Sequence, residues 1–472
     1  MTSAIVVGSG PNGLSAALTL ARSGLEVTVL EAAAQPGGGA RSVEATLPGL
    51  LHDECSGFHP LAVDNAFSRS ADLAAHGLIW EWPEIQYAHP LDHGGATAVR
   101  DVLATSRTLF DDGSAWARVF GTAADDFRGL TDDLLRPMLR MPGNPASLAR
   151  LGASAGLPAS VLVRSWTTAE ARALFAGVAA HAFRPLDSLA SSAIGVVLGT
   201  AAHTCGWPVA RGGSQSIVEA MIRALQSLGG RVETGIRVSA LSELPPADLV
   251  LLDTSPAAAA AIAGERMPSR IARAYRRYTH GPGAFTASFA VEGGIPWSFE
   301  PASRAGTVHL GGTFEEIAAA ERMVHLGRMP ERPFVLLGQQ YVADPGRSAG
   351  GIVPVDAYAH VPAGFDGDAL SALVAQIERF APGFRERILA TAVRSTAALE
   401  AGNPNLVRGD IVGGANSALQ LLFRPRPAGD PYSTGVPGVY LCSSATPPGA
   451  GAHGMCGFNA ARSALAGLRR RG

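Results

Sequence analysis

Three glycines near the N-terminus are the first residues whose spacing predicts a particular chemistry. Gly8, Gly10 and Gly13 form the pattern G-x-G-x-x-G directly after a short apolar strand expected over Ala4–Val7. In a dinucleotide-binding turn the first glycine permits the tight turn, the second lets the backbone approach a pyrophosphate, and the third lets helix and strand pack closely. The helix that follows would direct its free N–H groups and partial positive charge toward the phosphates.

An acidic residue completes this unit. A second expected strand, Val27–Leu30, ends at Glu31, where a carboxylate can accept hydrogen bonds from ribose hydroxyls. The glycine pattern alone is a weak signal, but the order strand, loop, helix, strand and acid is a strong one. The sequence therefore predicts a dinucleotide site at the N-terminus.

A second glycine cluster follows the acidic residue. Residues 36–42 read PGGGARS and contain Gly38, Gly39 and Arg41. An NAD-dehydrogenase unit does not require glycines here, whereas FAD proteins of the glutathione-reductase-like superfamily often have such a cluster followed by arginine. The pattern favours FAD as the dinucleotide, and a plain surface turn is the alternative interpretation.

The middle of the chain is typical of the second half of an FAD-binding fold. Residues 211–213 read RGG and lead into a helix with apolar residues at helical spacing. Strands are expected over Arg231–Thr234, Arg237–Leu241 and within residues 247–256. These elements would return to the sheet that the N-terminal unit begins.

The last segment predicts a strand over Val439–Cys442, a Pro/Gly loop, and a helix from about Gly454 to Leu468. Gly449, Gly451 and Gly454 repeat the glycine pattern, but no strand and acid follow them. We therefore interpret this loop as closing over a flavin, and we expect no second nucleotide unit.

These blocks resemble the phytoene-desaturase-like FAD-dependent oxidoreductases. The resemblance is to the branch labelled pyridine nucleotide-disulfide oxidoreductase domain-containing protein, through PPGAGAHGMCGFNAA (447–461), HPLDHGG (89–95) and AHTCGWPVARGG. The resemblance implies a set of residues that contact FAD. Among them, Val238 would contact the adenine through its backbone. Where the superfamily often has Gly-Asp or Gly-Glu, this chain has Ser443-Ser444. The implied FAD contacts are Gly8, Gly10, Gly13, Glu31, Gly38, Gly39, Arg41, Val238, Gly451, Gly454 and Met455.

The expected fold class is α/β, a glutathione-reductase-like (Rossmann-type) FAD-binding domain interleaved with a mixed-sheet and helical substrate domain. Residues 1–85, 206–265 and 426–472 would form the first domain, and residues 86–205 and 266–425 the second. Strand-like runs and helices in the second domain predict a mixed sheet capped by helices. The expected helices are Ala123–Met138, Ala169–Phe183, Ser188–Thr200 and Asp368–Phe380, and the expected strands are Gly283–Val291 and Phe334–Tyr341.

Composition narrows the partners. The chain has 472 residues and a net charge of −2, which gives no reason to expect nucleic acid. None of its four cysteines forms a CxxC pair, so a disulfide relay, a metal site or an oxidising compartment is not expected. No signal peptide or membrane-length apolar run is found, which predicts a cytoplasmic protein. Membrane contact would be peripheral at most. The basic tail Arg469–Arg471 could touch anionic lipid, but a solvated helix end that complements the helix dipole is the preferred interpretation.

Three functions compete. The first is an FAD-dependent dehydrogenase or desaturase that removes hydride from a hydrophobic small molecule and passes electrons to an unknown acceptor, with oxygen and quinones both open. The second is a flavin amine oxidase, a group in which a lysine-held water commonly lies at flavin N5; this chain has no lysine. The third is a non-catalytic flavin-bound interaction protein.

Three histidines are candidate catalytic groups, because imidazole exchanges protons near neutral pH. His453 lies in the flavin-closing loop, and we expect it to influence flavin chemistry most. His59 follows the second glycine cluster, and His203 precedes residues 211–213. Each could instead hold a loop by hydrogen bonds. Cys456 could tether a flavin, but an unreactive buried cysteine is the preferred interpretation.

Overall fold

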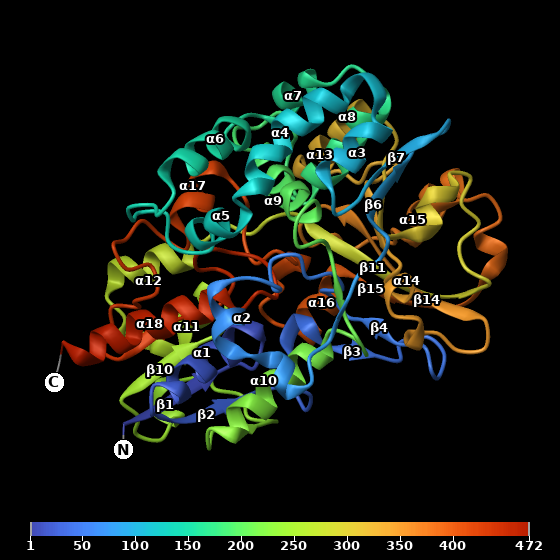
Figure 1. The fold of residues 1–472 in the computed structure, drawn as a ribbon. Coiled ribbons are helices and arrows are strands. Elements are labelled where there is room, and N and C mark those ends of the chain that lie inside the picture. Colours follow the sequence, from blue (N-terminus) through green and yellow to red (C-terminus); the bar gives the residue numbers. More distant parts are fainter. Residues whose placement is uncertain (1, 471–472) are drawn as a thin grey trace.

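Two β-sheets organise the chain, and the structure, a computed structural model, describes residues 2–470 (Figure 1). The first sheet is parallel throughout, with strand order β16-β10-β1-β2-β9. Its strands come from three separate parts of the sequence. They are β1 (Ser3–Val7), β2 (Glu26–Leu30), β9 (Arg231–Glu233), β10 (Leu249–Leu252) and β16 (Val439–Leu441).

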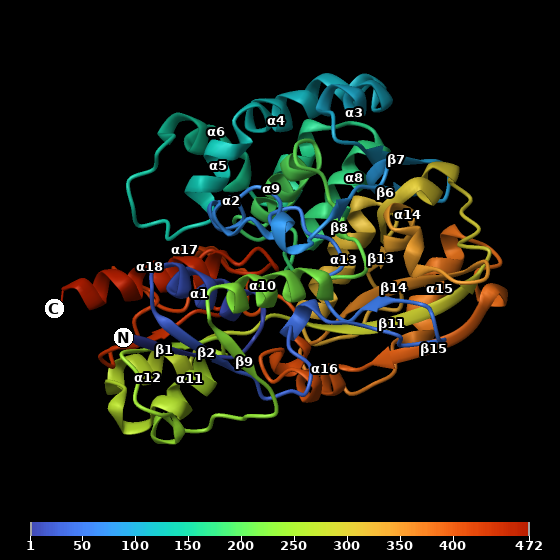
Figure 2. The same cartoon turned by 60° about the horizontal axis from the view of Figure 1, so that its bottom comes forward.

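Helices cover both faces of this sheet (Figure 2). One face packs on α1 (Pro11–Arg22), α10 (Gln215–Ser227) and α18 (Met455–Arg469), and the other on α11 (Pro256–Ala263) and α12 (Ser269–Arg276). Coverage on both faces explains why β1 and β10 read as continuous apolar runs rather than alternating ones. The carboxyl ends of the strands remain free for a ligand.

The second sheet is mixed and has strand order β15-β11-β14-β13-β12-β6-β7. Within the described residues, β6–β12 is the one parallel pair of this sheet. Its strands are β6 (Ile85–Pro90), β7 (Gly95–Ala98), β11 (Gly283–Glu292), β12 (Ala305–Leu310), β13 (Val335–Gly338), β14 (Ile352–Val361) and β15 (Ile388–Arg394).

A layer of helices from residues 102–202 lies over one face of the second sheet, and α15 (Leu370–Phe380) packs on the other. The layer contains α3 (Val102–Thr108), α4 (Gly113–Asp125), α5 (Phe127–Leu134), α6 (Pro145–Ala155), α7 (Ala159–Leu162), α8 (Ala169–Ala180) and α9 (Ser192–Ala202). The helix α13 (Phe314–His325) packs on α8.

The other α-helices and strands are short. The short helices are α2 (Ala66–Ala71), α14 (Gln340–Ala343), α16 (Thr396–Gly402) and α17 (Ala418–Phe423). The short strands form two pairs, β3 (Ser42–Val43) with β4 (His52–Asp53) and β5 (Trp80–Glu81) with β8 (Val209–Ala210).

The expected fold class is confirmed, but several expected elements were wrong in detail. The helix over Ala123–Met138 is broken at Asp126, which separates α4 from α5. The strand over Arg237–Leu241 is absent from the described chain. Instead, the N–H groups of Gly235 and Ile236 donate to the loop after β2, which turns the chain away from the sheet edge. The strand expected over Phe334–Tyr341 ends at Gly338, and the helix α14 begins two residues later, at Gln340.

Among residues 2–470, no single helix is both long enough and apolar enough to cross a membrane. The bent pair Pro145–Ala155 and Ala159–Ser165 meets the length and composition criteria only when both helices are taken together. Of the basic tail, Arg469 ends α18 and Arg471 lies outside the described residues.

Candidate functional site

A cavity of about 1080 Å³ begins at the carboxyl ends of β1, β2 and β10 and reaches the second sheet. Its volume lies at the upper limit of small-molecule sites. We call the part lined by residues 7–12, 30–41, 236–262, 401–406 and 443–453 the dinucleotide end. We call the part lined by residues 134–156, 181–198, 207, 307, 336, 358 and 411–424 the apolar end.

The glycine loop has the geometry that its spacing predicts. Gly8 has a φ of +102°, in the region that favours glycine, and its N–H donates to the Leu30 carbonyl at 2.8 Å. A Cβ on residue 13 would lie 2.1 Å from the Gly8 carbonyl oxygen, so only glycine lets α1 approach β1 this closely. Gly13 therefore serves packing beneath the cavity rather than lining it.

Gly10 lies between two other segments at the start of α1. A Cβ on residue 10 would lie 2.8 Å from Oδ2 of Asp253, and a Cβ on Gly38 would lie 3.1 Å from the Gly10 Cα. The two predicted glycine clusters are thus in direct contact, and both line the cavity. The start of α1 thus lies at the cavity wall, where a helix N-terminus favours a ligand phosphate.

Asp253 is a site residue that the sequence analysis missed. It directly follows β10, and its Oδ2 accepts the Gly13 N–H at 2.9 Å. Burial raises the pKa of this carboxyl to about 7, against the lowering effect of the Gly13 hydrogen bond, and Glu31 raises it further. Its place directly after a buried strand was the available signal, since ligands of parallel sheets bind at the carboxyl ends of the strands.

Glu31 lines the cavity from the end of β2. Its Oε2 accepts the Ser9 N–H at 2.9 Å and the Ser9 hydroxyl at 2.6 Å, and its Oε1 accepts the Ala33 N–H at 2.8 Å. A carboxylate offers about four acceptor positions. Three are used by the protein, which leaves room for a ribose hydroxyl.

The other residues implied to contact FAD divide into two groups. Gly38, Gly39, Arg41, Val238 and Gly451 line the cavity, and the Arg41 guanidinium is held by Glu54 at 2.6 Å. Gly454 and Met455, in contrast, are not among the described residues that line it. A Cβ on Gly454 would lie 2.7 Å from the Phe67 ring and 3.0 Å from the Ser15 Cβ, so this glycine packs on α1.

Four buried polar atoms that line the cavity lack a hydrogen-bond partner among residues 2–470. Buried polar groups are normally paired, because an unpaired one costs about 1–3 kcal/mol. Unpaired atoms at a cavity wall therefore indicate a ligand that completes them. The four atoms are Asn12 Oδ1, His59 Nδ1, Thr307 Oγ1 and Ser443 Oγ. The first and last lie at the dinucleotide end and fit a bound dinucleotide such as FAD.

His453 lines the cavity but is engaged with its own loop. Its Nδ1 accepts the Met455 N–H at 3.1 Å, which assigns the proton of the neutral ring to Nε2. Burial lowers the pKa of His453 to about 4, and a hydrogen bond with the Ala450 backbone opposes this effect. The ring is therefore neutral and holds the loop, which is the alternative that the sequence left open.

His59 is placed differently. Its Nε2 lies 2.9 Å from the Ser214 hydroxyl, which itself donates to the Ser56 carbonyl, so His59 Nε2 carries the proton and Nδ1 has a free lone pair. Burial lowers the pKa of His59 to about 4, although Asp53 raises it. His59 is thus a neutral acceptor at the cavity wall, and the better candidate of the two for receiving a proton.

The prediction that His203 is a catalytic candidate needs correction. His203 is not among the described residues that line the cavity. Its Nε2 accepts from the Trp116 indole N–H at 2.9 Å and its Nδ1 donates to the Val99 carbonyl at 2.8 Å, so both nitrogens are used within the helical layer. Cys456 is likewise buried away from the cavity, and burial raises the pKa of its thiol to about 12.

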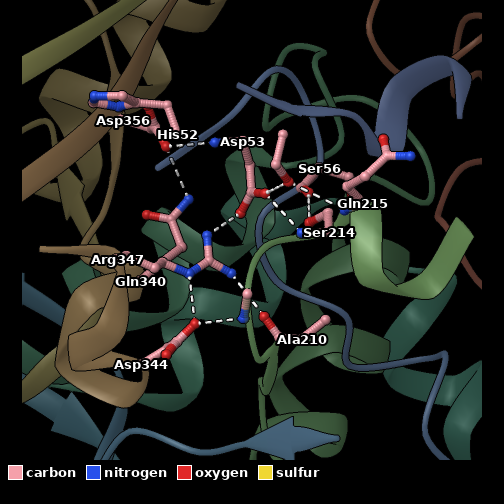
Figure 3. A network of polar contacts seen from close by, with 12 residues as sticks. His52, Asp53, Ser56, Ala210, Ser214, Gln215, Gln340, Asp344, Arg347 and Asp356 are labelled. Carbon is pink, nitrogen blue, oxygen red and sulfur yellow. Dashed lines mark hydrogen bonds and ion pairs between the residues drawn. The ribbon is translucent and has the colours of Figure 1, made fainter. Parts of the chain in front are cut away.

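A buried polar network holds Ser214 (Figure 3), whose hydroxyl lies 2.9 Å from His59 Nε2. Arg347 donates to Asp53 at 2.6 Å and to Asp344 at 3.2 Å, and Asp53 accepts the Ser214 N–H at 2.8 Å. Burial would raise the pKa of Asp53, but the Arg347 cation and the hydrogen bonds from Ser42, Ser214 and Arg347 together outweigh burial, and the pKa is lowered. The Asp53 N–H also donates to Asp356 of β14 at 3.1 Å, so the network joins the loop before α10 to the second sheet and positions Ser214, the partner of His59.

Comparisons with known proteins agree with this geometry. A family model described as an NAD(P)-binding Rossmann-like domain matches residues 6–69. Pyridine nucleotide-disulfide oxidoreductase domain-containing protein 2 of Mus musculus is 43% identical over 86 residues, which are 18% of this chain and 15% of that protein. The match thus spans a small part of the curated relative.

Two solved structures are similar over nearly their whole length. An oxidoreductase from Methanosarcina mazei has a TM-score of 0.65 at 14% identity, covering 98% of this chain and 100% of that one. A wild-type putrescine oxidase bound to putrescine has a TM-score of 0.59 at 17% identity, covering 100% of this chain and 98% of that one. The comparisons confirm the fold class, with its parallel Rossmann-like sheet.

Proposed function

We propose that this protein binds FAD at the dinucleotide end and oxidises a mainly apolar small molecule at the apolar end of the same cavity. Glu31 would bind the ribose, and Asn12 and Ser443 would supply buried polar atoms that now lack partners. When bound, FAD would accept hydride at N5. The protein would orient the substrate, exclude water, and receive the accompanying proton at His59 Nδ1.

The observation that carries this proposal is the lining of the apolar end. Of the described lining residues, only Glu31 and Asp253 carry a carboxylate, and both lie at the dinucleotide end. The apolar end is walled by leucine, valine, isoleucine and aromatic side chains with a few polar groups, the usual composition of a site for an apolar ligand. Its large apolar lining residues include Leu134, Leu148, Leu151, Leu189, Ile194, Val197, Leu198, Trp207, Leu336, Leu421 and Leu422.

The same lining separates this proposal from the amine-oxidase alternative. An alkylammonium buried without a counter-charge is strongly disfavoured, because an ion removed from water needs a partner. The apolar end offers no carboxylate, and the chain has no lysine to hold a water at the flavin. The likeness to putrescine oxidase therefore concerns the fold. The reaction that we propose is therefore a phytoene-desaturase-like dehydrogenation of a carbon chain. Oxygen or a quinone would be the final electron acceptor.

The proposal is tested by anaerobic reduction of the bound flavin. The purified protein is mixed with long-chain apolar compounds, including a lipid extract, and in parallel with putrescine and cyclohexylamine. We expect bleaching near 450 nm (roughly, the ordinary flavin band) only with an apolar compound, whose oxidised product is then identified by mass spectrometry.

The His203→Gln protein is the control, because His203 lies outside the cavity and should leave the set of reducing compounds unchanged. Rapid bleaching by the small amines, with none by the apolar compounds, would contradict the proposed substrate class.

A further inference from the structure

A polar wall closes the apolar end of the cavity. Thr307 on β12 and His181, which directly follows α8, both line it. The Thr307 hydroxyl is buried and lacks a hydrogen-bond partner among residues 2–470. Nothing in the dinucleotide site or in the proposed hydride transfer uses these two residues, so their role needs its own explanation.

His181 does not stand alone. Its Nε2 lies 2.8 Å from Nε2 of His309, and the two rings are perpendicular, with centroids 5.0 Å apart. His309 lies on β12 two residues after Thr307, so the two side chains share a face of the sheet. His309 is fully buried and belongs to the wall behind His181.

The protons of this pair can be assigned from the surroundings of His309. Its Nδ1 is buried without a partner and faces α8, since a Cβ on Gly177 would lie 2.8 Å from this nitrogen. An unpaired buried N–H is rarer in proteins than an unpaired acceptor. We therefore assign the His309 proton to Nε2, which donates to His181 Nε2.

It follows that His181 carries its own proton on Nδ1. Burial lowers the pKa of His181 to about 3, and the neighbouring His360 lowers it further. Burial also holds the pKa of His309 well below its ordinary value, and the neighbouring His181, His89 and His360 add to this effect. Each ring is thus neutral with one proton. No residue in the described part of the chain accepts the Nδ1–H of His181, which leaves it for a ligand in the cavity.

We propose that the His181 Nδ1–H and the Thr307 hydroxyl form a donor pair that binds one uncharged oxygen acceptor, a carbonyl or a hydroxyl, on an otherwise apolar substrate. This inference rests on the proposed function and names its substrate class more narrowly. His181 would contact the substrate, and His309 is a positioning residue that fixes which nitrogen of His181 donates. An alkylammonium group has donors only and no acceptor, so the pair disfavours it.

Binding without turnover tests the assignment. The purified, cofactor-containing protein is titrated with 2-undecanone, undecane and undecylamine, each displacing a fluorescent apolar probe. A ketone only accepts hydrogen bonds, so it reports on donors in the wall. We expect 2-undecanone to bind about tenfold more tightly than undecane, as one or two added hydrogen bonds allow, and undecylamine no better than undecane.

Matched variants locate the effect. His181→Phe should reduce the ketone-to-alkane ratio to about one, and His181→Gln, which keeps an N–H donor, should restore part of it. Thr307→Val should lower the ratio without lowering the affinity for undecane, and His309→Leu should lower it although His309 does not line the cavity. His325→Phe is the control, because His325 is exposed on α13.

Equal affinities for 2-undecanone and undecane in the unchanged protein would overturn the proposal. An unchanged ketone-to-alkane affinity ratio in the His181→Phe variant would overturn it too. A preference for 1-undecanol with none for the ketone would show that His181 accepts rather than donates, and would also overturn it. These outcomes do not depend on flavin reduction. A protein that prefers the ketone but lacks a reducible flavin would contradict the proposed function alone.

Discussion

Gly10→Val should abolish dinucleotide binding. A Cβ at this position already lies 2.8 Å from Oδ2 of Asp253, so a valine side chain would displace the loop whose backbone must approach a pyrophosphate closely. The purified variant should contain below about a tenth of the cofactor per protein found in the unchanged protein, because the approach to the phosphates is blocked rather than weakened. Flavin absorbance relative to protein absorbance measures this ratio.

Gly121→Val is the matched control. Gly121 lies in α4, and a Cβ added there meets nothing within 4 Å. This variant should keep its cofactor. Circular dichroism of both variants separates a blocked site from an unfolded protein. A folded Gly10→Val protein with full cofactor content would show that the ligand does not approach this loop.

Asp253→Asn should stabilise the protein above neutral pH. The folded pKa of Asp253 is about 7, against an ordinary value of 3.8, so between these values the folded state holds a proton that the unfolded state has released. Stability therefore falls as pH rises from about 4 to 7, at a cost approaching about 4 kcal/mol above that range. Asparagine is neutral at every pH and still accepts the Gly13 N–H.

The free energy of unfolding by urea, measured from pH 4 to pH 8, tests this dependence. The variant and the unchanged protein should agree near pH 4 and diverge as pH rises, with the variant the more stable at pH 8. Asp366→Asn, at an exposed position, should produce no such divergence. If Asp253→Asn were the less stable protein at pH 8, the carboxylate would instead be ionised and stabilised by the N-terminus of α1.

The strand–loop–helix geometry around Gly8 and Gly13 could be predicted from the sequence because its parts are local. Gly8, Gly13 and Glu31 act through neighbours within one strand–helix–strand unit, and short-range spacing determines that unit. Asp253 was missed as a site residue because its partner Gly13 is 240 residues away in the chain. Only the parallel pairing of β1 with β10 brings the two together.

The apolar end was harder to predict for the same reason. Its apolar character follows from composition, but the pairing of His181 with His309 spans 128 residues and two different layers of the fold. Its closeness in sequence to residues 211–213 makes His203 a candidate, yet its ring turns into the helical layer and hydrogen-bonds with Trp116 and Val99. Closeness in sequence indicated neither which histidines reach the cavity nor which nitrogen each presents.

The central claim is that the cavity beginning at Gly8 and Glu31 holds FAD. Heat release of the cofactor from the purified protein, followed by chromatography and mass spectrometry, tests it most directly. We predict FAD at close to one molecule per chain, because the glycine loop, the carboxylate and the unpaired atoms of Asn12 and Ser443 form one site. Recovery of FMN alone, of a nicotinamide dinucleotide alone, or of no cofactor from a protein that also fails to bind added FAD would contradict the claim.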